Sequence, residues 1–222
     1  MKYYKNNSFL RNSIRKIIPL QIRSFIWGLR PKVFLLNTYI LNNPKSFVNK
    51  HPIDNKYRIR EVTSADICHL KTAYNKRGPR SYNRIPDRLS APEWHGLAVF
   101  DSNTGGIAYI AWIIDNSIPF FEEFGITLRK DQFLLKDGFC VPEYRHQGLH
   151  TRMEQERINY CVNNGAKDIF IQIHDSNKKG IQSVTENGYI FFKQNHIISW
   201  PIFSTYRELK SFLKKPFKKV IR

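Results

Sequence analysis

One short segment, Val141 to His150, carries the residues of this 222-residue chain that are best suited to bind a phosphate group. It lies between a predicted strand, 133–141, and a predicted amphipathic helix, 149–163. A tight turn that opens a helix directs unpaired backbone N–H groups at one point, where the helix dipole also favours an anion. Gly148 lets a phosphate approach the backbone closely, and Arg145 adds a fixed positive charge. The segment therefore predicts a cradle for a pyrophosphate.

A second motif follows the next predicted strand. Asn177 comes just after the strand 168–174, and Gly188-Tyr189 follows eleven residues later. Together the two segments resemble the GNAT superfamily of N-acetyltransferases, over about residues 57–195. In that family Arg or Gln, x, x, Gly, x, Gly or Ala forms the coenzyme A pyrophosphate loop, and a later Asn positions the pantetheine arm.

The resemblance implies acetyl-CoA as co-substrate and an N-acetyltransferase activity, as in members that act on amino sugars in surface polysaccharide synthesis. The residues that it assigns to coenzyme binding are Phe139, Cys140, Val141, Arg145, His146, Gln147, Gly148, Leu149, His150 and Asn177.

This chain departs from the family pattern at two positions. His150 stands where the family commonly has a small residue, so its ring is expected to contact a phosphate or to crowd it. Val184 stands where many members carry a Tyr that protonates the departing thiolate. The thiolate must then be stabilised or protonated by another group or by water.

Acyl transfer to an amine requires a base, because the acceptor is an ammonium ion at neutral pH. Asp137 is the first candidate, with a strand-edge ion pair as the alternative. Glu122 and Glu123 come next, or belong to a surface loop; His174 is third, or is a structural histidine. The backbone N–H groups of Cys140 and Val141 are expected to polarise the thioester carbonyl.

The cysteines predict neither covalent catalysis nor a disulfide framework. Cys68, Cys140 and Cys161 are scattered, without metal-ligand spacing, so no metal site is expected. Cys140 is interpreted as strand packing. A reducing, cytoplasmic compartment follows as the expectation.

Hydrophobic periodicity predicts the elements that must hold these residues. Strands are expected at 57–62, 97–101, 107–114, 133–141, 168–174 and 189–193, and helices after Thr63, at 149–163 and at 178–186. The stretch 71–95 should be loop and short helix. This order predicts an α/β (α+β) fold: a GNAT-like mixed, mostly antiparallel central sheet with helices on both faces.

The net charge of +18 is concentrated at the two ends. Residues 1–50 hold ten Lys or Arg and no acid, and 207–222 hold seven against Glu208. We therefore divide the chain into a basic amphipathic N-terminal extension (1–55), an acyltransferase domain (56–200) and a basic C-terminal helix or tail (201–222). The ends either pack on the domain or attach to an anionic membrane surface, which would make the protein peripheral on the inner membrane face. No run is long enough to span a bilayer.

The acceptor is expected to be a small-molecule amine that carries a phosphate. The stretch from Lys71 to Arg88 holds six cations against only Asp87, which suits a nucleotide- or lipid-linked amino sugar, although a solvated loop explains it equally well.

Three alternatives remain: a non-catalytic GNAT-fold binding protein, a nucleic-acid or ribosome binding protein that uses the basic ends, and an enzyme acting on a protein amine. The concentration of charge at the ends does not favour nucleic acid. A homodimer is compatible with the sequence.

Overall fold

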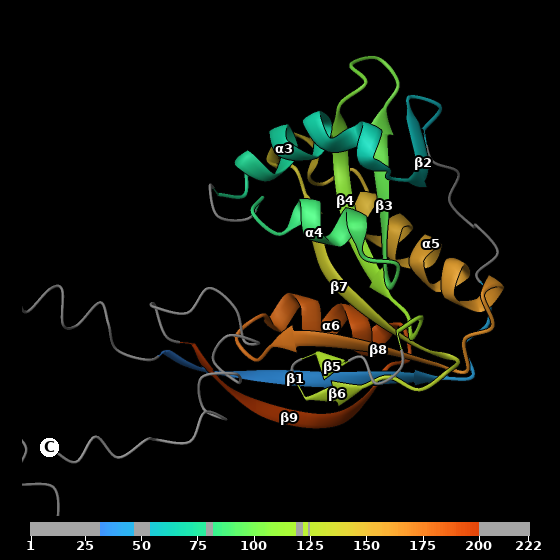
Figure 1. Cartoon of the computed structure of the whole chain (residues 1–222), viewed down its shortest axis with the longest axis vertical. Helices are drawn as coiled ribbons and strands as arrows, with labels where there is room; N and C mark the ends of the chain where they lie inside the picture. The colour runs from blue at the N-terminus through green and yellow to red at the C-terminus, as the bar shows by residue number, and fades with distance from the viewer. Residues whose placement is uncertain (1–31, 47–53, 79–81, 119–121, 124, 200–222) are drawn as a thin grey trace, which may run out of the picture. The chain divides into compact units, whose positions relative to one another are not determined.

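The computed structural model describes residues 32–46, 54–78, 82–118, 122–123 and 125–199 (Figure 1). The chain divides into two compact units, residues 36–195 and a second unit of residues 1–35 and 196–222. Of the second unit, only residues 32–35 and 196–199 are described. Residues 32–35 begin one strand, and residues 196–199 end another. Every residue of the candidate site lies in the first unit.

The described elements follow one another in a mixed order of strands and helices. They are β1 (Lys32–Asn42), β2 (Tyr57–Glu61), η1 (Ser64–Asp66), α3 (Ile67–Asn75), α4 (Ile85–Ser90), β3 (Trp94–Asp101), β4 (Ile107–Ile114), β5 (Glu122–Glu123), β6 (Ile126–Thr127), β7 (Gln132–Cys140), η2 (Pro142–Tyr144), α5 (Leu149–Asn163), β8 (Asp168–His174), α6 (Lys178–Glu186) and β9 (Ile190–Ser199).

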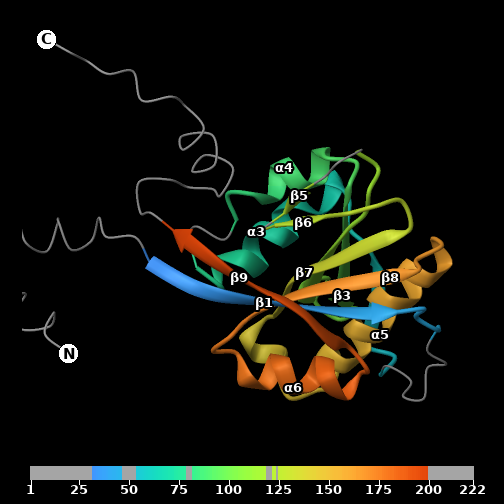
Figure 2. The same ribbon diagram turned by 90° about the horizontal axis from the view of Figure 1, so that it is seen from below.

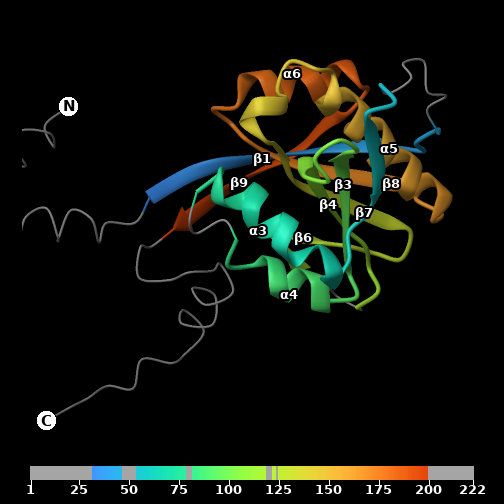
Figure 3. The same cartoon turned by 90° about the horizontal axis from the view of Figure 1, so that it is seen from above.

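Seven of these strands form one sheet, in the order β2-β3-β4-β7-β8-β1-β9. The pairs β2–β3, β3–β4, β4–β7 and β1–β8 are antiparallel, and β7 pairs with β8 in parallel. Helices α5 and α6 cover one face of the sheet, and α3 and α4 cover the other (Figures 2 and 3). The mixed, mostly antiparallel fold class expected from the sequence is thereby confirmed.

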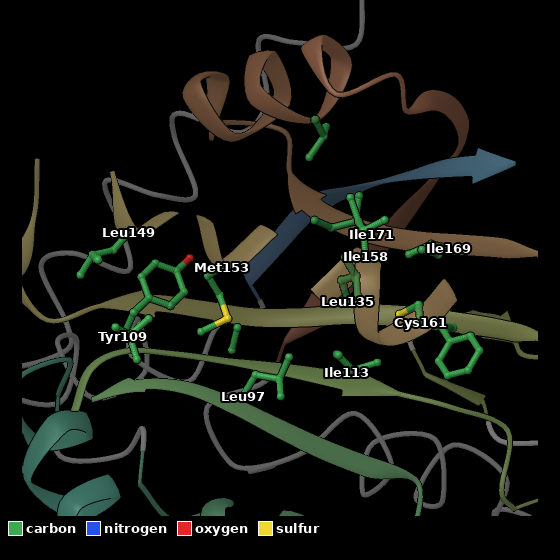
Figure 4. Packing of buried hydrophobic residues seen from close by; sticks show 14 of the residues in the cluster. Leu97, Tyr109, Ile113, Leu135, Leu149, Met153, Ile158, Cys161, Ile169 and Ile171 are labelled. Atoms are coloured by element: carbon green, nitrogen blue, oxygen red, sulfur yellow. The ribbon is translucent and has the colours of Figure 1, made fainter. Parts of the chain in front are cut away.

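Each face of the sheet buries its own apolar cluster, because successive strand residues point to opposite sides. Beneath α5 and α6, Tyr109, Ile113 and Leu135 pack against Met153 and Ile158 (Figure 4). Residues of the opposite cluster include Leu70, Tyr74, Ile85, Ile110, Trp112 and Phe139. The sheet is therefore held rigidly from both sides at the place where the site lies.

Several predicted elements have the bounds given by the sequence. Helix α5, strand β8 and helix α6 begin and end where periodicity and capping residues placed them. Gly165 has φ +81° just after α5, the left-handed conformation that a helix-ending glycine adopts. The two strands around the turn 102–106 pair as β3 and β4.

Strand β1 was not predicted from the sequence. Residues 32–42 pair along β8, from Leu36 opposite His174 to Asn42 opposite Asp168, so the predicted extension 1–55 contains a strand of the central sheet. The apolar run in this segment is too short to span a bilayer, and the basic residues around it indicated a tail, not a strand. The two-stranded sheet β5–β6 was also not predicted. Residues 1–31 of the predicted basic extension and the C-terminal tail 201–222 lie outside the described residues.

None of the helices in the described part of the chain is both long and apolar enough to cross a membrane.

His95 on β3 lies between two carboxylates and makes stability depend on pH. Its Nε2 is 3.0 Å from Asp115 Oδ2 and its Nδ1 is 3.3 Å from Glu61 Oε1. The hydrogen bond with Asp115, followed by the Asp115 charge and the contact with Glu61, outweighs burial and raises the pKa of His95.

A raised pKa means that the stabilisation is complete below the ordinary histidine value of about 6.5 and fades as pH rises through the folded value. We expect His95→Gln to cost about 1 kcal/mol in the free energy of unfolding at pH 5.5 and little at pH 9. Urea unfolding of both proteins at the two pH values measures this. A cost that is the same at both would contradict the assignment.

Candidate active site

The site is centred on the parallel strands β7 and β8, which separate partway along their length. Their pairing runs from Gln132 opposite Asp168 to Leu135 opposite Ile171 and then stops, although β7 continues to Cys140 and β8 to His174. Figure 1 shows the two strands starting close together and diverging toward their carboxyl ends. Beyond Leu135, the edge of β7 that faces β8 is therefore free of strand pairing.

A β-bulge distorts β7 where the separation begins. Ile110 of β4 pairs with Phe139 and Trp112 pairs with Lys136, so Asp137 and Gly138 together oppose one residue of β4. Asp137 has φ +48°, an unusual value for a residue with a side chain. At Gly138 a Cβ atom would lie only 2.7 Å from the Tyr109 hydroxyl, which explains why glycine stands there.

The bulged strand directs the Cys140 N–H toward β8. The Val141 N–H donates to the Ala108 carbonyl on β4 (2.9 Å), so it is not available to a thioester. Because neighbouring N–H groups of a strand point to opposite edges, the Cys140 N–H points toward β8. Of the two amides expected to polarise the carbonyl, Cys140 therefore has the right direction and Val141 does not.

The turn between β7 and α5 gathers a set of unpaired backbone N–H groups. His146 and Gly148 have φ +63° and +72°, and a Cβ at Gly148 would meet nothing within 4 Å. Among the described residues, none accepts a hydrogen bond from the backbone N–H groups of residues 146–150. Unpaired amides at a helix N-terminus are what an anion site requires, so the turn has the backbone geometry expected of the cradle, and its role in binding a phosphate stays a prediction.

Side chains from other elements hold this turn in place. Gln147 Oε1 accepts hydrogen bonds from Lys56 Nζ (3.2 Å) and from the Tyr57 hydroxyl, at the start of β2. Lys76, just after α3, forms an ion pair with Glu143. Arg145 is exposed at the end of η2. The turn is therefore held by residues at the start of β2, and η2 just before it is held by Lys76.

The ring of His150 turns back toward the sheet. Its Nδ1 lies 2.8 Å from the Tyr109 hydroxyl. Burial of part of the imidazole lowers the pKa of His150, so the ring is neutral at neutral pH. A bulky residue at this position was expected to crowd the cradle. The hydrogen bond between Nδ1 and Tyr109 holds the ring on the sheet side, which relieves this crowding.

Asp137, the first candidate for the base, is held by two guanidinium groups on the α3/α4 face. Arg88 pairs with its Oδ2, and Arg77 Nη2 lies 3.7 Å from its Oδ1. Burial raises the pKa of Asp137, but the positive charges of Arg88, Lys136 and Arg77 outweigh it and the net pKa is lowered. Asp137 is therefore ionised at neutral pH. The ion pair that was the alternative for this residue is present, and the role of Asp137 as base stays a prediction.

Arg88 itself is fixed by aromatic rings. Its guanidinium carbon lies 4.4 Å from the Trp94 ring centre and 5.3 Å from that of Trp112, and the residue is buried. The cation–π contacts and the ion pair leave Arg88 little freedom. Arg77 is more exposed and lies over Phe139 (5.7 Å).

The remaining candidate bases lie elsewhere or are undescribed. His174, exposed at the end of β8, has Nδ1 2.7 Å from the Ser176 hydroxyl and 3.0 Å from Asp175 Oδ1. Glu122 and Glu123 form strand β5 beside β6, and their side chains lie outside the described part of the structure. The roles of His174, Glu122 and Glu123 as bases stay predictions.

Asn177, the first residue of the second motif, has a structural role. Asn177 caps α6, since its Oδ1 accepts from the Gly180 N–H (3.1 Å). Its side chain is exposed, which leaves the amide nitrogen free to serve as a donor. Val184 is buried in the cluster beneath α5 and α6, so no acidic group stands at that position.

The contacts of Tyr109 with Gly138 and His150 at the candidate site were not predicted from the sequence. An aromatic residue in an apolar strand is most simply interpreted as core, and Tyr109 is indeed only 2% exposed. The available signal was Gly138, because a glycine inside a strand indicates the close approach of another group.

Searches by sequence found no relatives: no family model matches the chain, and no curated protein matches it. Solved structures do resemble it. A protein assigned to the GNAT family of acetyltransferases from Novosphingobium aromaticivorans gives a TM-score of 0.55 at 18% identity, over 75% of this chain and 64% of that one. The GCN5-related N-acetyltransferase from Sphaerobacter thermophilus gives 0.53 at 10% identity, over 81% and 55%.

A tandem GNAT protein from the clavulanic acid biosynthesis pathway gives a TM-score of 0.54 at 10% identity, over 83% of this chain and 59% of that one. The chain thus spans less than two thirds of each of these three proteins. At this level of identity the likeness shows the fold: this chain has the GNAT fold.

Proposed function

We propose, from the premise of the GNAT fold, that this protein is an acetyl-CoA dependent N-acyltransferase in which an amine attacks the thioester directly. The observation that carries the proposal is the set of unpaired N–H groups at residues 146–150, next to a strand that diverges from its parallel neighbour. A phosphate-binding turn and an unpaired strand edge are the two features that a long phosphopantetheine thioester requires. In this chain they are adjacent.

Each part of the site has a distinct task in this reaction. The amides of the turn and the exposed Arg145 bind the diphosphate, as helix N-termini do. The Cys140 N–H donates to the thioester carbonyl and stabilises the negative charge that forms when the amine attacks. Asn177 holds the pantetheine arm with its amide nitrogen. Coenzyme A supplies the activated acyl group.

The acceptor would approach from the α3/α4 face, where Asp137 meets Arg77 and Arg88. Asp137 receives the proton of the ammonium group directly or through water, and Arg77, which is exposed and loosely paired, is free to share an anionic group of the acceptor. We therefore keep the prediction of a phosphate-bearing primary amine, with a nucleotide- or lipid-linked amino sugar as the preferred class.

Labelled acetyl-CoA and the full chain provide the test. We expect binding at micromolar concentrations by calorimetry, and transfer of label to glucosamine 6-phosphate faster than to glucosamine. Failure to bind acetyl-CoA would refute the proposal. Binding without transfer or thioester hydrolysis would refute catalysis and indicate a binding protein, and equal rates with both sugars would refute the phosphate preference.

Replacing Asp137 tests its role in the reaction. We expect Asp137→Asn to lower kcat by about 100-fold or more, the usual contribution of a general base, while the affinity for acetyl-CoA stays within about twofold. Steady-state kinetics and calorimetry measure the two quantities. Asp131→Asn, which removes the partner of Lys167 at the other end of β7, serves as control. An unchanged kcat in Asp137→Asn would remove Asp137 as the base.

A further inference from the structure

The group that would stabilise the departing thiolate is not at its usual position, because Val184 is a buried apolar residue. Breaking the C–S bond leaves a negative charge on sulfur, and a hydrogen-bond donor aimed at that atom lowers the barrier. Such a donor must reach the β7 bulge, where the carbonyl and the sulfur would lie. It must also keep its proton at neutral pH.

Among the described residues, the Tyr109 hydroxyl meets both requirements. Tyr109 pairs directly with Cys140 across β4 and β7, so both side chains lie on the α5 face. Its hydroxyl lies over Gly138 of the bulge, close enough that a Cβ there would be 2.7 Å away. Burial raises the pKa of Tyr109 to about 12, so the phenol stays protonated.

His150 orients this hydroxyl. Its Nδ1 is 2.8 Å from Tyr109 Oη, and among the described residues His150 is the only hydrogen-bond partner of the hydroxyl. If the neutral imidazole carries its proton on Nδ1, it donates to the phenol oxygen and leaves the phenol proton to point elsewhere. The pKa of the Tyr109 hydroxyl is also influenced by the charges of four other groups, Arg157, Glu154, Cys140 and Arg77.

We propose that the Tyr109 hydroxyl, oriented by His150, donates a hydrogen bond to the leaving thiolate of coenzyme A. This inference rests on the proposed function. In the step, the acceptor nitrogen forms its bond to the carbonyl carbon, the C–S bond breaks, and its electron pair goes to sulfur. The phenol keeps its proton, the acceptor's proton goes to Asp137 or water, and solvent protonates the released thiolate. Tyr109 is thus a catalytic residue and His150 a positioning residue.

Binding of coenzyme A provides a test that needs no knowledge of the acceptor. A cysteine thiol titrates at about 8.5 and the alkyl thiol of coenzyme A somewhat higher, so coenzyme A has a substantial thiolate fraction at pH 9.5 and is a thiol at pH 6.5. Desulfo-coenzyme A, which lacks sulfur, controls for all other contacts. The quantity measured by calorimetry is the ratio of the two affinities at each pH.

We expect Tyr109→Phe to lower this ratio about tenfold or more at pH 9.5 and to change it less than twofold at pH 6.5, because a hydrogen bond to a charged group is lost. Tyr189→Phe is the matched control: Tyr189 is equally buried on the same face, but its hydroxyl meets Glu154 (3.4 Å). An identical ratio in wild type and Tyr109→Phe at pH 9.5 would overturn the inference alone. Absence of coenzyme A binding to wild type would overturn the proposed function as well.

His150 is exposed, so its variants should fold. We expect His150→Leu to lower the ratio at pH 9.5 and His150→Asn, whose amide nitrogen replaces Nδ1 as donor, to restore most of it. Equal loss in both variants would show that the ring does not orient Tyr109 by donation.

Discussion

Gly148→Glu should abolish the binding of acetyl-CoA, with a loss of affinity of about 100-fold or more. The substitution places a carboxylate at the helix N-terminus, beside the unpaired amides of residues 146–150, where the phosphate oxygens would bind. It also places a side chain at φ +72°, which costs about 1–2 kcal/mol of strain. Calorimetry measures the affinity, and urea unfolding measures the strain.

Gly165→Glu is a close control for this variant. Gly165 lies just after the other end of α5, with φ +81° and, like Gly148, nothing within 4 Å of an added Cβ. Both variants carry the strain of a side chain at positive φ, but only Gly148→Glu should lose acetyl-CoA binding. If Gly148→Glu bound acetyl-CoA as wild type does, the turn would not be the phosphate site.

Arg157→Met should destabilise the fold by about 3–5 kcal/mol. Arg157 and Glu154 form an ion pair in α5, and each is only 3% exposed. Tyr189 adds a hydrogen bond to the same carboxylate (3.4 Å). Removing the guanidinium leaves the Glu154 charge buried and unpaired, which is among the most costly changes in a protein interior.

The double variant Glu154→Gln with Arg157→Met should recover most of this loss, since no unpaired charge remains. Lys167→Met is the surface control: Lys167 pairs with Asp131 (2.6 Å) but is 75% exposed, so its removal should cost less than about 1 kcal/mol. Urea unfolding at pH 7 measures all three. A single Arg157→Met variant no less stable than the double variant would show that the pair is not buried in solution.

Local signals were strong enough to predict most of the elements around the site. Helix α5 has a glycine on each side in a left-handed conformation, and Asn177 caps α6 as its position indicated. The order of strands and helices then predicted a mixed sheet, because few topologies satisfy that order. Strand β1 was missed since its partner β8 lies far away in sequence, and no local pattern reveals such a pairing.

The site was predictable in its backbone but not in its side-chain partners. Glycine and helix start together indicated the phosphate turn, yet nothing in the sequence shows that Asp137 meets Arg77 and Arg88 or that the Val141 amide is used by β4. The bulge decides these contacts, because an extra residue in β7 redirects the neighbouring side chains and amides. Bulges depend on cross-strand register, which sequence spacing alone does not define.

The most direct measurement of the central claim is the amide NMR spectrum of the ¹⁵N-labelled chain during titration with acetyl-CoA. We expect the largest shifts at the backbone N–H groups of Gly148, Leu149 and His150 and at Cys140. The Val141 N–H should shift less, because it is hydrogen-bonded to the Ala108 carbonyl. Saturable shifts that spared residues 146–150, or no shifts at all, would contradict this claim.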